Sequence, residues 1–248
     1  MAEISVVISG ASSGIGAALA ELLSASGASV ALVARREVAL RALTARCGPR
    51  AIAIPADMTR RDEVRRSAHE AIARFGHVDA WVNNVGRGIS RLPSQLTDDD
   101  VDEMMRANVK SALYGMQEIL PHFQSRNAGH IINVSSMLGR MPHATIRSAY
   151  CGAKHFLNAL TATFRDELRQ SHPGIQVSLV SPGVVRTDFG LSAMHGGPDS
   201  RTFPESQSAE EVAAVIADVI ASRRPDVYTR AGARDRVAGY MAGVGEDP

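Results

Sequence analysis

The sequence predicts an α/β protein in which helices cover both faces of a doubly wound parallel sheet of about seven strands. Short β-branched runs bounded by glycine, serine or asparagine alternate with longer runs whose apolar residues recur at three- and four-residue spacing. The first short run also passes through a glycine-rich turn into a helical run. Because strands joined by helical crossovers pair in parallel, ligands are expected at the carboxyl ends of the strands.

The short β-branched runs give the positions of the strands, and the runs with three- and four-residue apolar spacing give those of the helices. Thr97 and the three aspartates after it predict a helix start, since a threonine N-cap and first-turn acids both stabilise one. No internal repeat or linker interrupts the chain, so we expect a single domain over residues 1–248. The expected strands are 4–8, 30–33, 51–54, 78–82, 131–134, 175–180 and 227–229, and the main expected helices are 17–23, 98–123, 148–168 and 208–222.

Composition restricts the classes of function. The net charge is +1 with no block of basic residues, which argues against nucleic acid and anionic membranes as partners. The two cysteines, Cys47 and Cys151, are too few for a disulfide framework and favour a reducing compartment. The start of the chain lacks the pattern of a signal peptide, and the most apolar helix candidate, 212–221, is too short to span a bilayer. We therefore expect a cytoplasmic protein with small-molecule partners.

A glycine-rich turn, S-G-A-S-S-G-I-G at residues 9–16, joins the first strand to the first helix. Glycines there permit a tight bend and close approach of the backbone to a pyrophosphate, and the helix N-terminus offers unpaired N–H groups and a favourable dipole. The turn predicts a dinucleotide site, and an ordinary strand-to-helix connection is the alternative. Its candidate cofactor-binding residues are Gly10, Ser12, Ser13, Gly14, Ile15 and Gly16.

The candidate reaction centre lies where the strand at 131–134 meets the helix that begins near residue 148. The strand ends in Ser135 and Ser136, and the helix presents Tyr150 and Lys154 four residues apart. Side chains at that spacing have Cβ atoms roughly 5–6 Å apart, so we expect the ammonium beside the phenol. An adjacent cation lowers the pKa of a phenol and makes it a usable acid or base. Taken alone, the pair is a weak signal, because any surface helix can carry a packed ring with a solvated lysine.

Together these motifs resemble the compact form of the short-chain dehydrogenase/reductase family, over nearly the whole chain. The resemblance implies a Rossmann-type fold and an active site of asparagine, serine, tyrosine and lysine beside a nicotinamide dinucleotide. It implies that Tyr150 donates a proton, that Ser136 hydrogen-bonds the carbonyl oxygen, and that Lys154 lowers the tyrosine pKa and binds the nicotinamide ribose. The interval between Ser136 and Tyr150 is one residue longer than the family's usual one, so the extra residue is expected within 140–148. The longer interval leaves Ser135 as an alternative, and Ser136 is preferred.

The end of the second strand bears on the choice of dinucleotide. In the family, an acid at the position of Ala34 holds the adenosine ribose of NAD, whereas a basic residue directly after it favours the 2′-phosphate of NADP. Here Arg35 and Arg36 follow, and a guanidinium binds phosphate bidentately with no carboxylate left to repel it. The pattern predicts NADP (NADPH), and solvated arginines at a helix start are the alternative.

Three further segments match family motifs. Residues 57–59, D-M-T, resemble the adenine-contacting turn, and Asp57 is also expected to cap the next helix. Residues 83–86, N-N-V-G, resemble the family's N-N-A-G, in which Asn84 contacts the cofactor or, alternatively, only braces the strand. Residues 182–187 are similar to the family's P-G-x-V-x-T, which meets the nicotinamide amide. The implied cofactor-binding residues are Asp57, Met58, Asn84, Gly86, Pro182, Gly183, Val185 and Thr187, with Tyr150 and Lys154.

Two features of the family's site remain. Asn108 matches the asparagine that bends its helix and holds a water between the lysine and solvent; without the resemblance it is an ordinary surface residue. Residues 189–204, rich in glycine, proline and serine, predict a mobile substrate lid. The histidines show no metal-ligand spacing, so no metal is expected.

The sequence therefore predicts an NADP-preferring oxidoreductase that interconverts a ketone or aldehyde and an alcohol, with Asn108, Ser136, Tyr150 and Lys154 as catalytic residues. One alternative is a nucleotide-sensing binding protein on the same fold, and another is an epimerase or dehydratase of the same superfamily. The apolar faces of the two long helices exceed what one sheet face covers, which predicts a homodimer or homotetramer. The substrate walls are expected from 87–96, 140–146 and 189–204, whose irregular sequences name no substrate.

Overall fold

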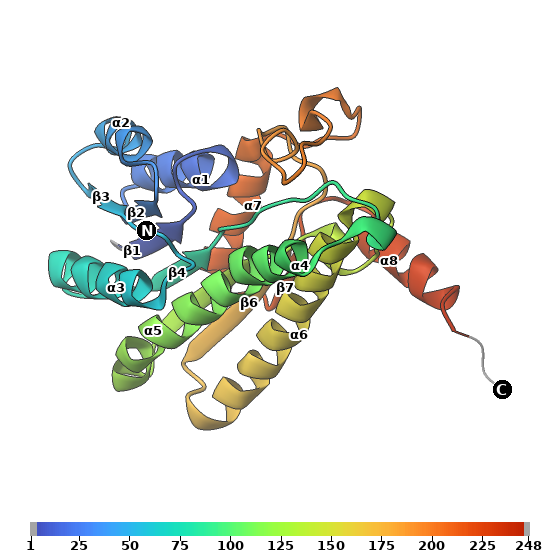
Figure 1. The fold of residues 1–248 in the computed structure, drawn as a ribbon. Coiled ribbons are helices and arrows are strands. Elements are labelled where there is room, and N and C mark those ends of the chain that lie inside the picture. Colours follow the sequence, from blue (N-terminus) through green and yellow to red (C-terminus); the bar gives the residue numbers. More distant parts are fainter. Residues whose placement is uncertain (1–3, 246–248) are drawn as a thin grey trace.

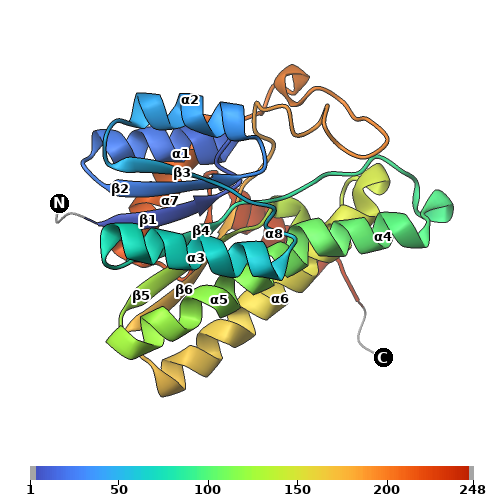
Figure 2. The ribbon, with the colours of Figure 1, turned by 60° about the vertical axis from the view of Figure 1, so that its left-hand side comes forward.

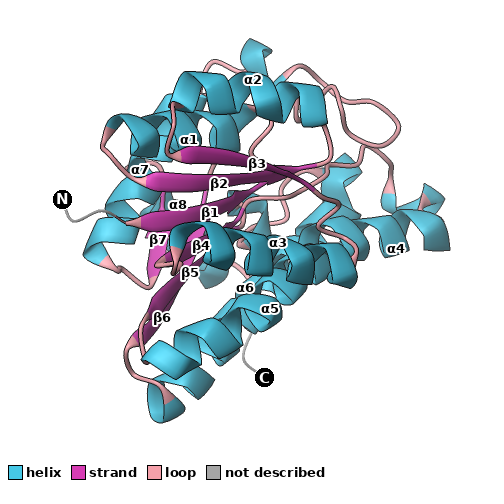
Figure 3. Cartoon of the chain, turned by 90° about the vertical axis from the view of Figure 1, so that its left-hand side faces the viewer, coloured by secondary structure: helices cyan, strands magenta, loops and turns pink. Residues whose placement is uncertain are grey.

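The structure, a computed structural model, describes residues 4–245. Within them a seven-stranded sheet runs in the order β3-β2-β1-β4-β5-β6-β7, and every pairing in it is parallel (Figure 1, Figure 3). This confirms the predicted doubly wound α/β class. The strands are β1 (Ser5–Ser9), β2 (Ser29–Ala34), β3 (Ala51–Pro55), β4 (Ala80–Asn83), β5 (Gly129–Val134), β6 (Ile175–Ser181) and β7 (Asp226–Tyr228).

Helices cover both faces of the sheet, as Figure 2 shows. One layer consists of α1 (Gly14–Ala25), α2 (Glu37–Cys47) and α7 (Ala209–Ser222). The opposite layer consists of α3 (Arg61–Phe75), α5 (Ser111–Arg126) and α6 (Ser148–Ser171). Two more helices complete the described chain: α4 (Asp98–Met105), which precedes α5, and α8 (Ala233–Ala242) near its end.

The strands are buried on both faces, which explains their nearly continuous apolar runs. In β5, for example, Ile132 and Val134 pack into the core under α1 and α7, whereas Ile131 packs into the core under α3 and α5. Successive side chains point to opposite faces of a strand, so a run without polar breaks supplies both cores at once.

The order of the strands locates the ligand-binding edge. β1 lies between β2 and β4, so the direction of winding reverses at this point of the sheet. Doubly wound sheets open a crevice at such a switch, outside the carboxyl ends of the strands. The glycine-rich turn follows β1 and residues 84–86 follow β4, so both segments lie at this crevice.

Some boundaries differ from those predicted. The helix expected at 98–123 consists of α4, a π-helical turn at Arg106–Lys110 and then α5. α1 begins at Gly14, inside the glycine-rich turn, and not at residue 17. α8 was not predicted; Ala233 is its one buried residue, and Val237 and Tyr240 on the same face of the helix are partly buried.

Residues 189–204 form an irregular segment that lies beyond the carboxyl ends of the strands, in orange in Figure 1 and Figure 2. Its regular structure is limited to a 3-10 turn at Ser200–Thr202. A parallel bridge pairs Met194 with Ile89, so the segment is joined to the loop that follows β4.

Candidate active site

The glycine-rich turn requires its glycines. Gly10 and Gly14 adopt φ angles of +68° and +56°, a region that side chains with a Cβ atom rarely occupy. A Cβ atom on Gly16 would lie 2.4 Å from the carbonyl oxygen of Gly10. Ser13 is the N-cap of α1, but its side chain caps no backbone N–H. The first N–H groups of α1 are therefore free to bind an anion such as a pyrophosphate.

Asn84 braces this turn. Its Nδ2 donates to the carbonyl oxygen of Gly10 at 3.3 Å, and its backbone N–H donates to Ser9 Oγ at 3.1 Å. Ser9 in turn donates to the carbonyl oxygen of Val82 at 3.1 Å. The contacts within the protein thus match the bracing alternative, and a cofactor contact by Asn84 is a proposal.

Both arginines after β2 are exposed at the glycine-rich turn or near it. Arg36 Nη2 donates to Ser13 Oγ at 2.7 Å and to Ser12 Oγ at 3.0 Å. Arg35 lies close enough to Asp57 for its charge to act on that carboxyl. Although burial acts to raise the pKa of Asp57, hydrogen bonds from Thr59 and nearby arginine charges lower it below its usual range. Two guanidinium groups therefore flank the adenosine side of the expected dinucleotide site.

Asp57 closes a turn and caps no helix, which corrects one expectation. Its Oδ1 accepts hydrogen bonds from the backbone N–H and the hydroxyl of Thr59, at 2.9 and 2.8 Å. The next helix, α3, starts only at Arg61, beyond the reach of this carboxylate, and has no side-chain cap. Met58 is buried in the core, so this turn offers a ligand the Met58 backbone rather than its side chain.

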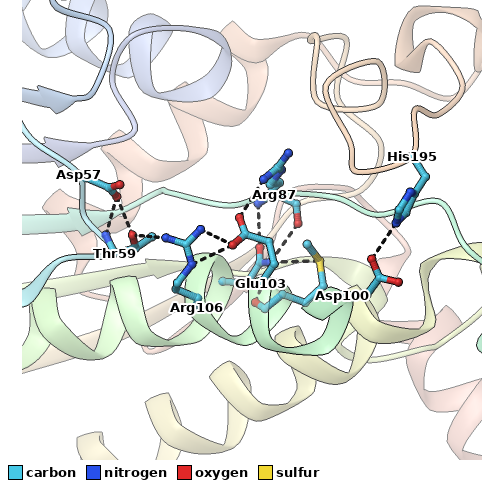
Figure 4. A network of polar contacts seen from close by, with 9 residues as sticks. Asp57, Thr59, Arg87, Asp100, Glu103, Arg106 and His195 are labelled. Atoms are coloured by element: carbon cyan, nitrogen blue, oxygen red, sulfur yellow. Dashed lines mark hydrogen bonds and ion pairs between the residues drawn. The ribbon is translucent and has the colours of Figure 1, made fainter. Parts of the chain in front are cut away.

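A chain of polar contacts joins this turn to the segment after β4 (Figure 4). Arg106 donates to Thr59 Oγ1 and to Glu103 Oε2, both at 2.8 Å, and Arg87 donates to Glu103 Oε1 at 2.9 Å. Glu103 and Arg106 were not predicted as part of the site, because their ion pairs depend on which loops meet in space. The network holds the two loops of the crevice at a fixed separation.

Asn108 lies in the π-helical turn and is completely buried. Its Nδ2 donates to the carbonyl oxygens of Met104 and Arg87, at 3.1 and 2.9 Å, and its Oδ1 accepts from the Arg87 N–H at 3.1 Å. The surface alternative for Asn108 is therefore wrong. A Cβ atom on Gly86 would lie 3.1 Å from Asn108 Oδ1 and 3.7 Å from Lys154 Nζ, so this glycine leaves room for both side chains.

The two serines after β5 face different partners. Ser136 Oγ accepts from the Leu138 N–H at 3.1 Å and lies close enough to the Tyr150 phenol to lower its pKa. Ser135 Oγ instead donates to Asn158 Oδ1 at 2.5 Å. The geometry thus places Ser136, and not Ser135, beside the tyrosine. Asn158 was missed, although it lies four residues after Lys154 on the same helix.

Tyr150 and Lys154 are both buried, and burial dominates their protonation. Burial raises the pKa of Tyr150 to about 12, and the Ser136 hydroxyl opposes this only in part. Burial likewise lowers the pKa of Lys154 to about 7. The sequence predicted a lowered tyrosine pKa, and this expectation is wrong, because burial acts in the opposite direction. Lys154 Nζ lies 5.8 Å from the ring centroid and donates to the Val134 carbonyl oxygen at 2.9 Å.

The segment after β6 lies against the glycine-rich turn. A Cβ atom on Gly14 would be 3.0 Å from Thr187 Cγ2. The carbonyl oxygen of Pro182 accepts from the Met137 N–H at 2.8 Å, which ties this segment to the loop after β5. Val185 is buried and forms a parallel bridge with Gln207. Residues 182–187 thus connect the two parts of the crevice.

The 189–204 segment covers the tyrosine. The Phe189 ring packs edge-on at 5.5 Å from the Tyr150 ring, measured between centroids, and Tyr150 is only 6% exposed. Further along, His195 Nε2 lies 2.7 Å from the buried carboxylate of Asp100, also shown in Figure 4. The segment is therefore fixed at two points over the candidate reaction centre.

Residues 4–245 form no helix that is both long and apolar enough to cross a bilayer. They also contain no group of three histidine, cysteine, aspartate or glutamate side chains arranged to hold a metal ion.

Comparison with known proteins identifies the family. A sequence model of the short chain dehydrogenase family matches residues 5–195. An uncharacterized oxidoreductase of Staphylococcus epidermidis is 36% identical over 193 residues, which cover 74% of this chain and 81% of the relative. The chain belongs to the short-chain dehydrogenase/reductase family, a family of oxidoreductases.

Solved structures agree on the fold. A short chain dehydrogenase/reductase from Burkholderia phymatum in complex with NAD superposes with a TM-score of 0.89 and 24% identity, over 99% of this chain and 97% of the other. A short-chain dehydrogenase from Streptomyces avermitilis superposes with a TM-score of 0.86 and 29% identity, over 98% of this chain and 94% of the other.

Proposed function

We propose that this protein is an NADP-dependent oxidoreductase that interconverts a ketone or aldehyde and an alcohol. One observation carries the proposal: Ser136, Tyr150 and Lys154 converge at the carboxyl end of β5, beside the switch point of the sheet. A hydroxyl next to a buried phenol provides two hydrogen-bonding groups for one oxygen atom. Membership of an oxidoreductase family supports the same chemistry.

The crevice has the features that a nicotinamide dinucleotide needs. The uncapped start of α1 would hold the pyrophosphate, and the absence of a Cβ atom on Gly16 lets this helix start pack closely against the turn. Residues 182–187 would meet the nicotinamide amide, and Lys154 would bind the nicotinamide ribose. When bound, the reduced nicotinamide supplies a hydride to the carbonyl carbon.

Arg35 and Arg36 support NADP as the dinucleotide. β2 ends at Ala34, so the strand end carries no carboxylate to repel a 2′-phosphate. Both guanidinium groups are exposed there, and Arg36 already reaches Ser12 and Ser13 of the glycine-rich turn. The Burkholderia relative holds NAD on the same fold, so the preference proposed here depends on the arginines of this chain.

Tyr150 acts as the proton donor in the reducing direction. With its pKa raised to about 12, the phenol is protonated at neutral pH and has a proton to give. Ser136 Oγ accepts from Leu138, which leaves its own proton free for the carbonyl oxygen. The C=O π bond breaks as the carbon gains a hydride and the oxygen gains the phenolic proton. Lys154 then stabilises the tyrosinate, and Asn108 serves the relay that returns a proton from solvent.

Residues 189–204 serve as a lid in this account. Because Tyr150 is almost fully covered and the Phe189 ring packs on it, a substrate reaches the phenol only if this segment moves. The contacts of Met194 with Gly88 and of His195 with Asp100 would close it again.

We also propose a homo-oligomer and a cytoplasmic location. Leu96, Val101, Met105 and Ala149 line a shallow apolar hollow where α4 meets α6, and Phe156 is half-exposed on α6. A second copy of the chain would cover such a surface. Light scattering that reported a monomer at micromolar concentration would contradict the oligomer.

The cytoplasmic location is supported by the two cysteines, which form no disulfide with each other.

The test is a screen of carbonyl compounds with NADPH and NADH, and of secondary alcohols with NADP and NAD, followed by nicotinamide absorbance. The proposal predicts turnover of at least one carbonyl–alcohol pair, faster with the phosphorylated cofactor. Tight dinucleotide binding without turnover of any compound would favour the binding-protein alternative.

A further inference from the structure

Arg147 is a buried arginine whose guanidinium has no partner within residues 4–245. The residue is only 9% exposed, and its Nη1 is fully buried without a hydrogen bond. Its backbone N–H donates to Ala144, but its side chain makes no hydrogen bond or ion pair with the described part of the chain. Charged side chains are almost never buried unless paired, so this arrangement calls for an explanation.

The guanidinium lies where the three expected substrate walls meet. A Cβ atom on Gly88 would lie 2.4 Å from Arg147 Nη1, and a Cβ atom on Gly197 would lie 3.0 Å from Arg147 Nη2. Gly88 belongs to the loop after β4 and Gly197 to the lid, whereas Arg147 closes the loop after β5. The two glycines give the guanidinium its space.

The reaction centre is adjacent. Arg147 precedes Tyr150 by three residues at the start of α6, and its positive charge acts on the phenol. A Cβ atom on Gly88 would also lie 3.1 Å from the Phe189 ring, which packs on Tyr150. A group bound by Arg147 would therefore belong to the molecule whose carbonyl faces Tyr150.

The surroundings favour an anion. Asp100, the buried carboxylate of this region, already pairs with His195 at 2.7 Å and with Arg91 at 2.8 Å. The hydroxyl of Ser90 is buried without a hydrogen-bond partner. A Cβ atom on Gly197 would lie 3.0 Å from Ser90 Oγ and 3.0 Å from Arg147 Nη2, so both groups lie beside this glycine. No side chain caps the N-terminus of α6, so the helix dipole adds positive potential there.

We propose that Arg147 binds an anionic group of the substrate, a carboxylate or a phosphate, so that the enzyme acts on oxo acids or phosphorylated ketones and their alcohols. The inference rests on the proposed function and names the substrate class for that site. A guanidinium donates two parallel hydrogen bonds to either anion, and the burial of Arg147 strengthens them. The free energy of substrate binding then compensates the cost of burying the unpaired cation.

The test compares matched carbonyl compounds in the full-length protein with saturating cofactor. The pairs are pyruvate with methyl pyruvate, levulinate with methyl levulinate, and hydroxyacetone phosphate with hydroxyacetone. We expect kcat/KM for at least one anion to exceed that of its neutral partner by about 10- to 150-fold, the worth of one charge-assisted contact. The first two pairs report on a carboxylate and the third on a phosphate.

Substitutions of Arg147 test whether this residue causes the preference for anionic substrates. Arg147→Met should remove the preference by raising KM for the anion, with kcat on the neutral partner changed only a few-fold. Arg147→Lys keeps the positive charge but lacks the paired N–H donors of a guanidinium, so it should lose part of the preference for the anion. Arg147→Met should fold, because removing an unpaired buried guanidinium relieves a desolvation cost. Arg169→Met is the matched control: this arginine is exposed at the far end of α6, and its loss should change nothing.

The outcomes separate this inference from the proposed function. If the protein reduces neutral ketones as well as the anionic partners, or if Arg147→Met keeps the anion preference, the inference is overturned and the proposed function stands. If no compound is turned over, the proposed function fails, and calorimetry with levulinate and inorganic phosphate decides the inference. Saturable binding that Arg147→Met abolishes would support it; absence of binding, or binding equal in both proteins, would overturn it.

Discussion

Lys154 Nζ lies 5.8 Å from the centroid of the Tyr150 ring and donates its hydrogen bond to the carbonyl oxygen of Val134, at the end of β5. The ammonium is therefore held beside the phenol by the strand. Burial acts on the two groups in opposite directions, so the pKa of Tyr150 rises and that of Lys154 falls. Both shifts favour the neutral forms, which leaves the phenol with a proton to donate.

The two arginines after β2 should set the cofactor preference. Arg35→Ala and Arg36→Ala should each weaken NADPH binding by about 10- to 150-fold and leave NADH binding nearly unchanged, because each removes a charge-assisted contact to the 2′-phosphate. Calorimetric titration with both cofactors measures this. Arg41→Ala is the control, since Arg41 is exposed on α2 and pairs with Glu37. Equal affinities of the unmutated protein for NADPH and NADH would refute the preference.

The two serines after β5 should have different roles: Ser136 should contribute mainly to activity, and Ser135 mainly to stability. Ser136→Ala should lower kcat by on the order of 10²–10³, as removal of one oxyanion donor does. Ser135→Ala should lower kcat far less but reduce the free energy of unfolding by about 1–3 kcal/mol, because Asn158 Oδ1 loses a buried donor. Steady-state kinetics and urea unfolding of both variants check this. If Ser135→Ala lowered kcat strongly and Ser136→Ala did not, the catalytic role would belong to Ser135.

His130 should make the protein sensitive to acid. Burial lowers the pKa of His130 from 6.5 to about 3, and its Nε2 lies 2.7 Å from Ser178 Oγ. Between these pH values the unfolded state binds more protons than the folded state, so stability falls as the pH falls. The loss should reach roughly 3 kcal/mol at pH 4, at about 1.4 kcal/mol per pKa unit.

Thermal unfolding between pH 7 and pH 4 measures this contribution. His130→Gln should be less stable than the unmutated protein at pH 7, and the difference should shrink as the pH falls. His69→Gln, at an exposed position on α3, should follow the unmutated protein throughout. A constant difference between His130→Gln and the unmutated protein would show that His130 titrates normally.

The sheet and the chemical motifs could be predicted from the sequence because both are local patterns. Runs such as 131–134 must be apolar on both faces, and the residues after them must lie at the carboxyl edge. The choice of Ser136 over Ser135 as the partner of Tyr150 came from the resemblance to the family, because both serines follow the same strand. The arrangement of the glycine-rich turn followed in the same way from its spacing.

What the sequence did not predict depends on contacts between distant segments. The resemblance predicted a local bend of the helix at Asn108, but not its form as a π-helical turn at Arg106–Lys110, which depends on the bonds between Asn108 and the loop carrying Arg87. The lone guanidinium of Arg147 appears only once the lid and the loop after β4 are in place. The direction of the Tyr150 pKa shift likewise depends on burial under Phe189, which the spacing of Tyr150 and Lys154 does not reveal.

The most direct test of the proposed function is the turnover of Tyr150→Phe, measured with the best substrate of the screen and with NADPH affinity determined in parallel. The substitution removes one oxygen atom from a ring whose packing against Phe189 is kept. The account predicts a loss of kcat of at least 10²–10⁴, the worth of a general acid, with NADPH affinity changed by less than about twofold. Near-normal kcat in Tyr150→Phe would contradict the assignment of Tyr150 as the proton donor.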